Sequence, residues 1–193
     1  AEFGLFGRGD AVNILKKNLC NIVTSCSEDH LDWLPKDERT IERIIYEKTS
    51  SLLNSNIIVA KQTSEKITEC IKKNIFNNNA NKYFFKKDYN FVLKENDFFY
   101  YEDKYGGLKI PKPNMKGQFQ LENASTAIAT LRILEDLKVK DEQIINGVKK
   151  ANNVARLEEI KSGKLKNLIK NNILILDSSH NPGGAKVLNE YLK

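Results

Sequence analysis

Short apolar runs alternate with amphipathic stretches in the first part of the chain. Residues 21–25 and 57–60 are rich in Ile and Val, which predicts two buried strands. Residues 37–53 and 64–76 carry apolar side chains three to four positions apart, which predicts a helix after each strand. A strand–helix–strand–helix order is typical of a parallel sheet with helices packed on it.

The middle of the chain is aromatic and alternating. Residues 83–110 place Tyr, Phe, Val and Leu in short runs between polar residues, with Gly106-Gly107 near the end. This pattern predicts a small antiparallel meander with a hairpin at the glycine pair. Beyond it, apolar residues at helical spacing predict helices over 122–137 and 141–150.

The C-terminal part of the chain returns to an α/β pattern. Residues 156–160 predict a strand, and the four apolar residues 173–176 predict a short, fully buried strand. A polar turn follows, which Pro182 and two glycines interrupt, and a helix is predicted from Ala185. This order is the first half of a second α/β unit.

The pattern as a whole predicts an α/β protein with two domains. Asn152-Asn153 is the candidate linker, so the first domain spans residues 1–153 and the second spans residues 154–193. The first domain combines a parallel sheet, its helices and the antiparallel meander. The second begins with a strand and reaches one helix after the buried strand.

Polar side chains follow two of the predicted strands. Asp177 and His180 come after residues 173–176, and His30 lies a few residues beyond 21–25. Open α/β sheets bind their ligands beyond the carboxyl ends of the strands. The chain has two histidines, and each of them follows an apolar strand. The sequence therefore indicates an enzyme.

Composition and charge exclude several other classes of protein. Hydrophobic residues make up 40% of the chain and charged residues 29%, as in an ordinary globular protein. No run of about 18 apolar residues occurs, so we expect no membrane span. The net charge is +6, but the lysines are scattered, and we expect no nucleic-acid partner. Cys20, Cys26 and Cys70 lack metal-site spacing, which predicts reduced thiols in a cytoplasmic protein.

Six motifs occur in order along nearly the whole chain. They are Glu2-x-Gly-Leu-x-Gly-Arg-x-Asp-Ala-x-Asn13, Asp29-His30-x-Asp-Trp-Leu, Glu47-Lys48, Gly117-Gln-x-Gln120-x-x-Asn123-Ala, Ala155-Arg156-Leu-Glu and Asp177-x-x-His180-Asn-Pro. The series resembles the folylpolyglutamate synthase/dihydrofolate synthase branch of the Mur ligase family. The resemblance implies a Mur-ligase-type central ATPase domain, followed by the start of a Rossmann-like C-terminal domain that serves glutamate ligation.

The same resemblance implies an activity and its partners. Members of this family are ATP-dependent amide ligases that phosphorylate a carboxylate and then let the amine of L-glutamate attack the acyl phosphate. The implied partners are dihydropteroate or folate and L-glutamate, the implied cofactors are ATP and Mg²⁺, and we expect a monomer.

The resemblance also implies roles for residues near the acyl phosphate. Glu2 and His30 match the magnesium ligands of the family, and Mg²⁺ takes its remaining oxygens from water and phosphate. Lys48 matches the lysine that the family carbamylates, which turns an ammonium into an anion. His180 matches a position beside the nucleotide, and with Lys48 it forms the predicted catalytic set.

Two further sets of residues follow from the resemblance. Asn123 matches the asparagine that reads adenine, since an amide donates and accepts at once. Arg156 matches the arginine that contacts the phosphates of ATP, where its planar fork suits phosphate oxygens, and Asp177 matches the ATP-binding aspartate. The loop Gly9-Asp10-Ala11 falls where the family binds the pterin.

The sequence departs from the family pattern at several points. Phe6 stands where the family usually has Gly, Val12 stands where it usually has Thr, and the spacing from His30 to Lys48 is longer than expected. The phosphate-binding loop GxxxxGK[ST] does not occur in the chain, and most of the family's C-terminal domain is also missing. We therefore expect this fragment alone to be inactive.

Two alternatives stay open: a Mur-type ligase for a cell-wall precursor, and a non-catalytic remnant of the family.

Overall fold

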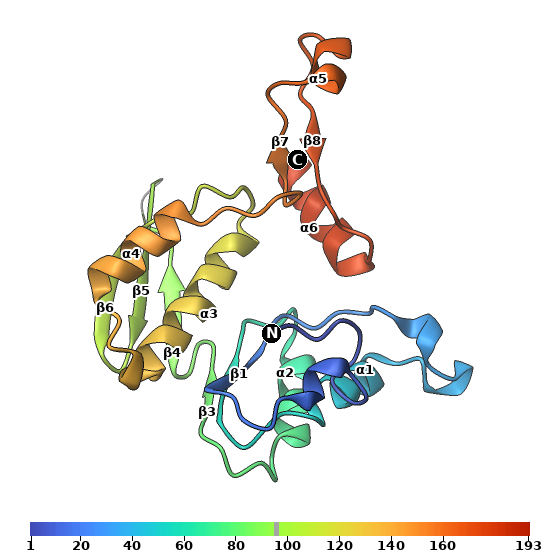
Figure 1. Ribbon diagram of the computed structural model, residues 1–193, viewed down its shortest axis with the longest axis vertical. Coiled ribbons are helices and arrows are strands. Elements are labelled where there is room, and N and C mark those ends of the chain that lie inside the picture. The colour runs from blue at the N-terminus through green and yellow to red at the C-terminus, as the bar shows by residue number, and fades with distance from the viewer. Residues whose placement is uncertain (95–96) are drawn as a thin grey trace.

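The computed structural model describes residues 1–94 and 97–193. Figure 1 shows a parallel sheet with helices beside it near the N-terminus, a small antiparallel sheet covered by further helices, and a C-terminal segment whose outer part extends away from both. We call this last segment, residues 154–193, the C-terminal module. Within the described ranges no helix has the length and apolar character needed to cross a membrane.

The N-terminal sheet has three parallel strands in the order β1-β2-β3, which are β1 (Cys20–Val23), β2 (Asn56–Val59) and β3 (Lys82–Phe84). Helices α1 (Ile41–Thr49) and α2 (Glu65–Asn74) pack against each other beside it. The strand–helix alternation predicted from the sequence is confirmed here. Ile45, Ile57 and Ile71 are fully buried between the sheet and the two helices.

The two helices begin where a hydroxyl side chain caps them. The Thr40 side chain accepts a hydrogen bond from the Arg43 N–H at 3.2 Å, and the Ser64 side chain accepts one from Ile67 at 3.4 Å. The first helix is shorter than the predicted range 37–53, because its start is set by Thr40. The residues before it form short 3₁₀ helices, at Leu31–Trp33 and Lys36–Glu38.

The antiparallel sheet has the order β4-β5-β6, with β4 (Tyr89–Val92), β5 (Phe98–Asp103) and β6 (Gly106–Pro111). The predicted meander is confirmed over these strands, but its first part is wrong, because residues 82–84 pair in parallel with β2 instead. The hairpin turn is at Lys104-Tyr105, and Gly106 already pairs with Asp103. Glu95 and Asn96, within the predicted meander, lie outside the described residues.

Helix α3 joins the two sheets. It spans Phe119–Ile133 and contacts β2, β4 and β5, while α4 (Asp141–Lys150) covers β6. The prediction for α4 is confirmed at both ends, whereas α3 begins before residue 122, and Glu135–Leu137 forms a separate 3₁₀ turn. The Tyr89 hydroxyl donates to the Val59 carbonyl at 2.9 Å, which ties the meander to the parallel sheet.

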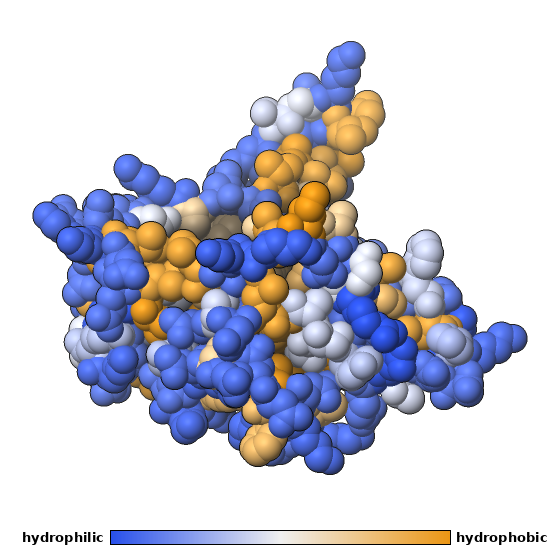
Figure 2. Space-filling model, turned by 60° about the horizontal axis from the view of Figure 1, so that its bottom comes forward, coloured by the Kyte–Doolittle hydropathy of each residue, from blue (hydrophilic) through white to orange (hydrophobic). Residues whose placement is uncertain are grey.

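The C-terminal module contains two short strands and two helices: β7 (Glu158–Glu159), α5 (Lys164–Leu168), β8 (Ile175–Leu176) and α6 (Pro182–Leu192). β7 and β8 pair antiparallel. The prediction that residues 173–176 form a fully buried strand is wrong, since Ile173 is 71% exposed and Leu176 is 46% exposed. β7 is the one strand that pairs with β8 among the described residues. Figure 2 shows the resulting apolar surface on the protruding part of the molecule.

Helix α6 also begins earlier than predicted. Asn181 is its N-cap, because the Asn181 Oδ1 atom accepts the Gly184 N–H at 2.8 Å. Pro182 then occupies the first helical position, where its missing N–H costs nothing. Pro182 and the two glycines therefore start the helix, and Ala185 lies inside it.

Candidate functional site

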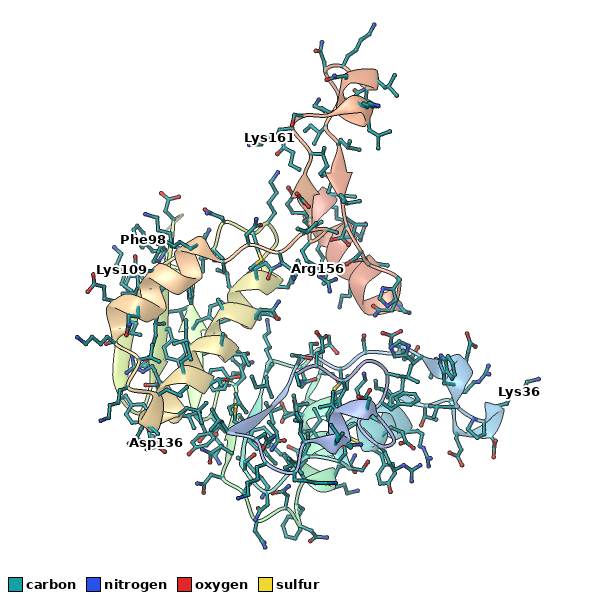
Figure 3. All side chains as sticks on the ribbon, in the orientation of Figure 1. Lys36, Phe98, Lys109, Asp136, Arg156 and Lys161 are labelled. Carbon is teal, nitrogen blue, oxygen red and sulfur yellow. The ribbon has the colours of Figure 1, made fainter. Side chains whose placement is uncertain are left out.

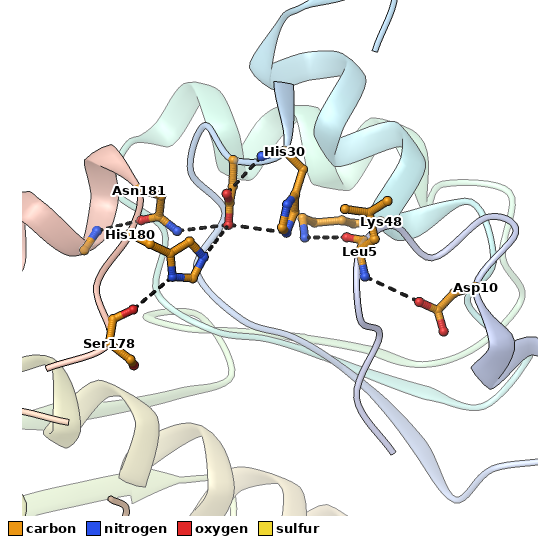
Figure 4. Close-up of polar contacts among 9 residues, drawn as sticks. Leu5, Asp10, His30, Lys48, Ser178, His180 and Asn181 are labelled. Atoms are coloured by element: carbon orange, nitrogen blue, oxygen red, sulfur yellow. Dashed lines mark hydrogen bonds and ion pairs between the residues drawn. The ribbon is translucent and has the colours of Figure 1, made fainter. Parts of the chain in front are cut away.

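The loop after β1 meets the loop before α6 at one carboxylate, that of Asp29. Its Oδ2 atom accepts a hydrogen bond from Asn181 Nδ2 at 2.9 Å. The same oxygen lies 3.5 Å from His30 Nε2 and 3.9 Å from His180 Nε2 (Figure 4). The two histidines of the chain, both predicted site residues, are therefore brought to the same side chain from opposite ends of the sequence.

His30 is held in an unusual backbone conformation. Its φ is 56°, in the left-handed region that a residue with a side chain adopts at a cost of roughly 1–3 kcal/mol. Asp29 Oδ1 accepts the His30 N–H at 2.9 Å, and the Phe6 ring meets the imidazole edge-on with 6.1 Å between ring centroids. These contacts direct the His30 ring into the junction and bring the N-terminal loop beside it.

The start of α6 fits closely against the β1 loop. A Cβ added to Gly183 would lie 2.7 Å from Ser27 Oγ, so a side chain at this position would push the two loops apart. The Asn181 side chain acts at both of its ends, capping α6 through its oxygen and binding Asp29 through its nitrogen. His180 Nδ1 donates to the Ser178 carbonyl at 2.9 Å, which orients the ring so that Nε2 points to Asp29.

Arg156 and Asp177 form a second polar group, where the C-terminal module begins. Asp177 accepts the Leu157 N–H and the Ser179 N–H, both at 2.8 Å, and Arg156 donates to the Ser178 hydroxyl at 2.7 Å. Partial burial raises the pKa of Asp177, but the hydrogen bonds and the nearby Arg156 charge outweigh it, and the pKa is lowered. Figure 3 shows Arg156 between the first turns of α3 and α6.

Asn123 lies exposed near the start of α3. Its amide nitrogen donates to Gln120 Oε1 at 3.2 Å, on the preceding turn of the same helix. Within the described part of the chain, this side-chain bond does not connect Asn123 to either of the polar groups above. Its exposed amide offers one N–H donor and one carbonyl acceptor side by side, so it could bind a ligand that needs both.

The predicted substrate loop Gly9-Asp10-Ala11 is a tight, ordered turn. The Asp10 carboxylate accepts the N–H groups of Val12 and Gly4, each at 2.9 Å, and these bonds lower its pKa, that from Val12 most. Gly9 has a φ of +76°, which glycine adopts without strain. Ala11 begins the 3₁₀ helix Ala11–Ile14 that Asp10 caps.

Lys48 contacts the same loop from the end of α1. Its Nζ donates to the Leu5 carbonyl at 3.3 Å (Figure 4). Glu2 is exposed at the beginning of this loop. Among the described residues, no cluster of three or more His, Cys, Asp and Glu side chains has a geometry that would hold a metal ion. The protein donors present here are therefore too few to hold Mg²⁺ without oxygens from water or phosphate.

A cavity of about 470 Å³ lies elsewhere. It is at one end of the meander, between the turns at 86–88 and 104–105 and the α3 residues Ala129 and Ile133. None of the predicted site residues line it. The candidate site is therefore defined by the polar junction and not by this cavity.

Two residues of the junction received no role from the sequence. Asp29 stands beside His30 and Asn181 beside His180, inside quoted motifs, yet only the structure brings them together. A signal for Asn181 was present, because Asn followed by Pro is typical of a helix N-cap and first position. Nothing in the spacing could show that this cap would also bind Asp29.

These features define an α/β chain in which a parallel-sheet domain meets a second α/β module at a polar junction. The fold is that of folylpolyglutamate synthases. The chain superposes on the FPGS-AMPPCP-folate complex with a TM-score of 0.82 and 20% identity, covering 100% of this chain and 46% of that one. It also matches E. coli FolC in complex with DHPP and ADP, with a TM-score of 0.79 and 28% identity over 98% of this chain and 41% of that one.

A curated relative gives the same result from sequence. Dihydrofolate synthase/folylpolyglutamate synthase of Escherichia coli (strain K12) is 27% identical over 205 residues, which cover 100% of this chain and 41% of that protein. No protein-family model matches the chain. The predicted resemblance and fold class are confirmed: the chain is similar to part of the folylpolyglutamate synthases, and it spans less than half the length of the relatives it matches.

Proposed function

We propose that this chain is part of an ATP-dependent amide ligase that adds L-glutamate to dihydropteroate or folate through an acyl phosphate. The observation that carries the proposal is the junction at Asp29. It joins His30 and His180, which belong to two of the motifs that resemble the family, from the two predicted domains. A junction of this kind can hold a nucleotide and an acceptor close together, and such positioning lowers the barrier to reaction.

We assign ATP to Asn123, Arg156 and Asp177. The Arg156 side chain is exposed, and its bond to Ser178 uses one of its five N–H donors, which leaves donors for phosphate oxygens. Asp177 anchors the loop that carries His180, so it supports the site even where its oxygens are already bonded. ATP would supply the phosphoryl group that activates the substrate carboxylate.

We assign Mg²⁺ to His30 and Glu2, completed by water and phosphate oxygens. Lys48 and His180 are the proposed catalytic residues. As an ammonium, Lys48 holds the Leu5 carbonyl, and carbamylation would replace this positive charge by a negative one close to the loop. Gly9, Asp10 and Ala11 are the proposed pterin-binding loop. Its backbone is ordered by the Asp10 carboxylate, which favours binding at low entropic cost.

We also propose that the domain boundary lies at Asn152-Asn153, directly after α4 ends at Lys150. The ligase would act as a monomer in the cytoplasm. The three cysteines are free thiols in the structure, which agrees with a reducing compartment.

The test is ADP release by the natural protein that contains this chain, with Mg-ATP, L-glutamate and either dihydropteroate or folate. We expect release that depends on both substrates, and we expect His30→Ala and Arg156→Ala to lower it at least about a hundredfold. Arg39→Ala, which removes an arginine that donates to the Leu34 carbonyl and pairs with Asp32, is the matched control. A folded protein that releases no ADP with either folate substrate would overturn the proposal in favour of a non-catalytic remnant. Activity only with a cell-wall precursor would support the Mur-type alternative.

A further inference from the structure

The end of α1 carries a buried carboxylate, that of Glu47, bound by two arginines. Arg8 makes a two-point contact with it, at 3.0 Å from Nε and 2.8 Å from Nη2, and Arg43 Nη2 lies 2.7 Å away. Glu47 is 4% exposed. Two-point contacts between arginine and carboxylate fix the relative orientation of both groups as well as adding energy. We call Arg8, Arg43 and Glu47 the arginine clamp.

Tyr46 and Glu38 complete the surroundings of the arginine clamp. The guanidinium groups of Arg8 and Arg43 lie 5.7 Å and 5.4 Å from the centroid of the Tyr46 ring. Arg43 also reaches the Glu38 carboxylate at 3.1 Å. The two positive charges are therefore balanced by two negative charges, so the buried Glu47 carboxylate has close partners.

The position of Glu47 is unfavourable for α1 itself. It lies in the last turn of the helix, where the helix dipole disfavours an acidic side chain and favours a basic one. A role in stabilising α1 alone does not account for a buried acid there. Its contacts instead reach across the sequence to Arg8, in the N-terminal loop.

The backbone of the N-terminal loop rests on the same turn. The Arg8 N–H donates to the Glu47 carbonyl at 3.1 Å. A Cβ added to Gly7 would overlap Ser51 Oγ and approach the Lys48 carbonyl to 2.8 Å, so only glycine lets the loop lie this close. Residues 7 and 8 are thereby fixed immediately before Gly9-Asp10-Ala11.

We propose that Glu47 is a positioning residue that sets the proposed pterin-binding loop through Arg8. The inference rests on the proposed function for the identity of the ligand. The positioning of the loop by Glu47 is argued from the contacts above and does not depend on the identity of the ligand. Glu47 does not need to touch the substrate. It binds Arg8, and Gly7 and Arg8 directly precede the residues of the loop.

The first experiment measures amide hydrogen exchange of residues 4–13 in Glu47→Gln and Arg8→Lys. Glutamine keeps the shape of Glu47 without its charge, and lysine keeps the Arg8 charge without the two-point contact. We expect about tenfold faster exchange in this loop, with α2 and the meander unchanged. Glu42→Gln is the matched control, since Glu42 lies on the same helix and pairs with the exposed Lys66.

The second experiment measures steady-state kinetics of the same variants in the natural protein. We expect KM for the folate substrate to rise about tenfold while KM for ATP stays within about twofold. Unchanged exchange in residues 4–13, or an equal rise in both KM values, would overturn the inference. If Glu47→Gln does not fold, Arg8→Lys alone tests the inference. We expect this variant to fold, because the Arg8 side chain is half-exposed. A protein without folate activity would refute the proposed function, while the exchange experiment would still test the clamp.

Discussion

The meander and the C-terminal module are stabilised in different ways. The meander buries Phe99, Tyr101 and Ile110 completely against α3 and α4. The C-terminal module leaves Ile173 and Leu168 mostly exposed. Burial of a large apolar side chain contributes about 1.5–3 kcal/mol, so the meander is stabilised by its own core. The module depends more on directional polar contacts, at Asp29 and Asp177, and these also shape the candidate site.

The largest expected effect comes from removing a core side chain of the meander. Phe99→Ala should lower the free energy of unfolding by about 3–5 kcal/mol, because it leaves a cavity in a fully buried position. Ile173→Ala in the module should change it by less than about 0.5 kcal/mol, since that side chain is 71% exposed. Urea unfolding measures both. Similar losses for the two variants would contradict the comparison.

A smaller effect is expected from breaking the contact between the module and the β1 loop. Asn181→Ser retains a capping oxygen for α6 and removes the amide that binds Asp29. We expect this variant and Asp29→Ala each to lower the free energy of opening of residues 155–192 by about 1–3 kcal/mol, measured by hydrogen exchange.

The double variant and a surface control sharpen this test. If Asp29 and Asn181 act through their mutual bond, the double variant should lose little more than either single variant. Asp32→Ala, whose side chain is 95% exposed, should leave the module unchanged. Losses that add fully would show that the two residues act independently.

The smallest effect is a pH dependence at Asp177. Its pKa is lowered below its ordinary value of 3.8, so its contribution to stability is complete above that value and is lost as the pH falls through the lowered pKa. We expect the Leu157 and Ser179 amide resonances to titrate with a midpoint below 3.8. Asp177→Asn should abolish this transition. A midpoint above the ordinary value would contradict the assignment.

Local sequence patterns correctly predicted the type and the bounds of an element where both depend on the residues of that element alone. The helix predicted over 141–150 matches α4 because the residues that set its apolar spacing and its two ends lie within or next to the segment itself. The aromatic run at 83–85 also predicts a strand correctly, but its partner is β2, distant in sequence, and local alternation cannot choose a partner. Residues 173–176 were predicted to be buried because an apolar run normally has a layer on each side, whereas Ile173 and Leu176 are exposed.

The candidate site was predictable as separate residues and not as an arrangement. His30 and His180 were singled out because each follows an apolar strand, and the structure brings both to Asp29. Asp29 itself has no distinguishing spacing. Its role depends on a contact with Asn181 across most of the chain, which no local pattern encodes. The roles of His30 and His180 remain predictions, as do those of Arg156, Asp177, Glu2, Lys48, Asn123 and the Gly9–Ala11 loop.

The double use of the Asn181 amide has a mechanical consequence. Its oxygen belongs to the first turn of α6, while its nitrogen belongs to the β1 loop. A turn of α6 about its own axis would carry the nitrogen away from Asp29 without uncapping the helix. The N-terminal end of α6 is thus bound to Asp29, next to His30. Loss of the bond to Asp29 would therefore weaken the contact between α6 and the β1 loop while the cap of α6 stays intact.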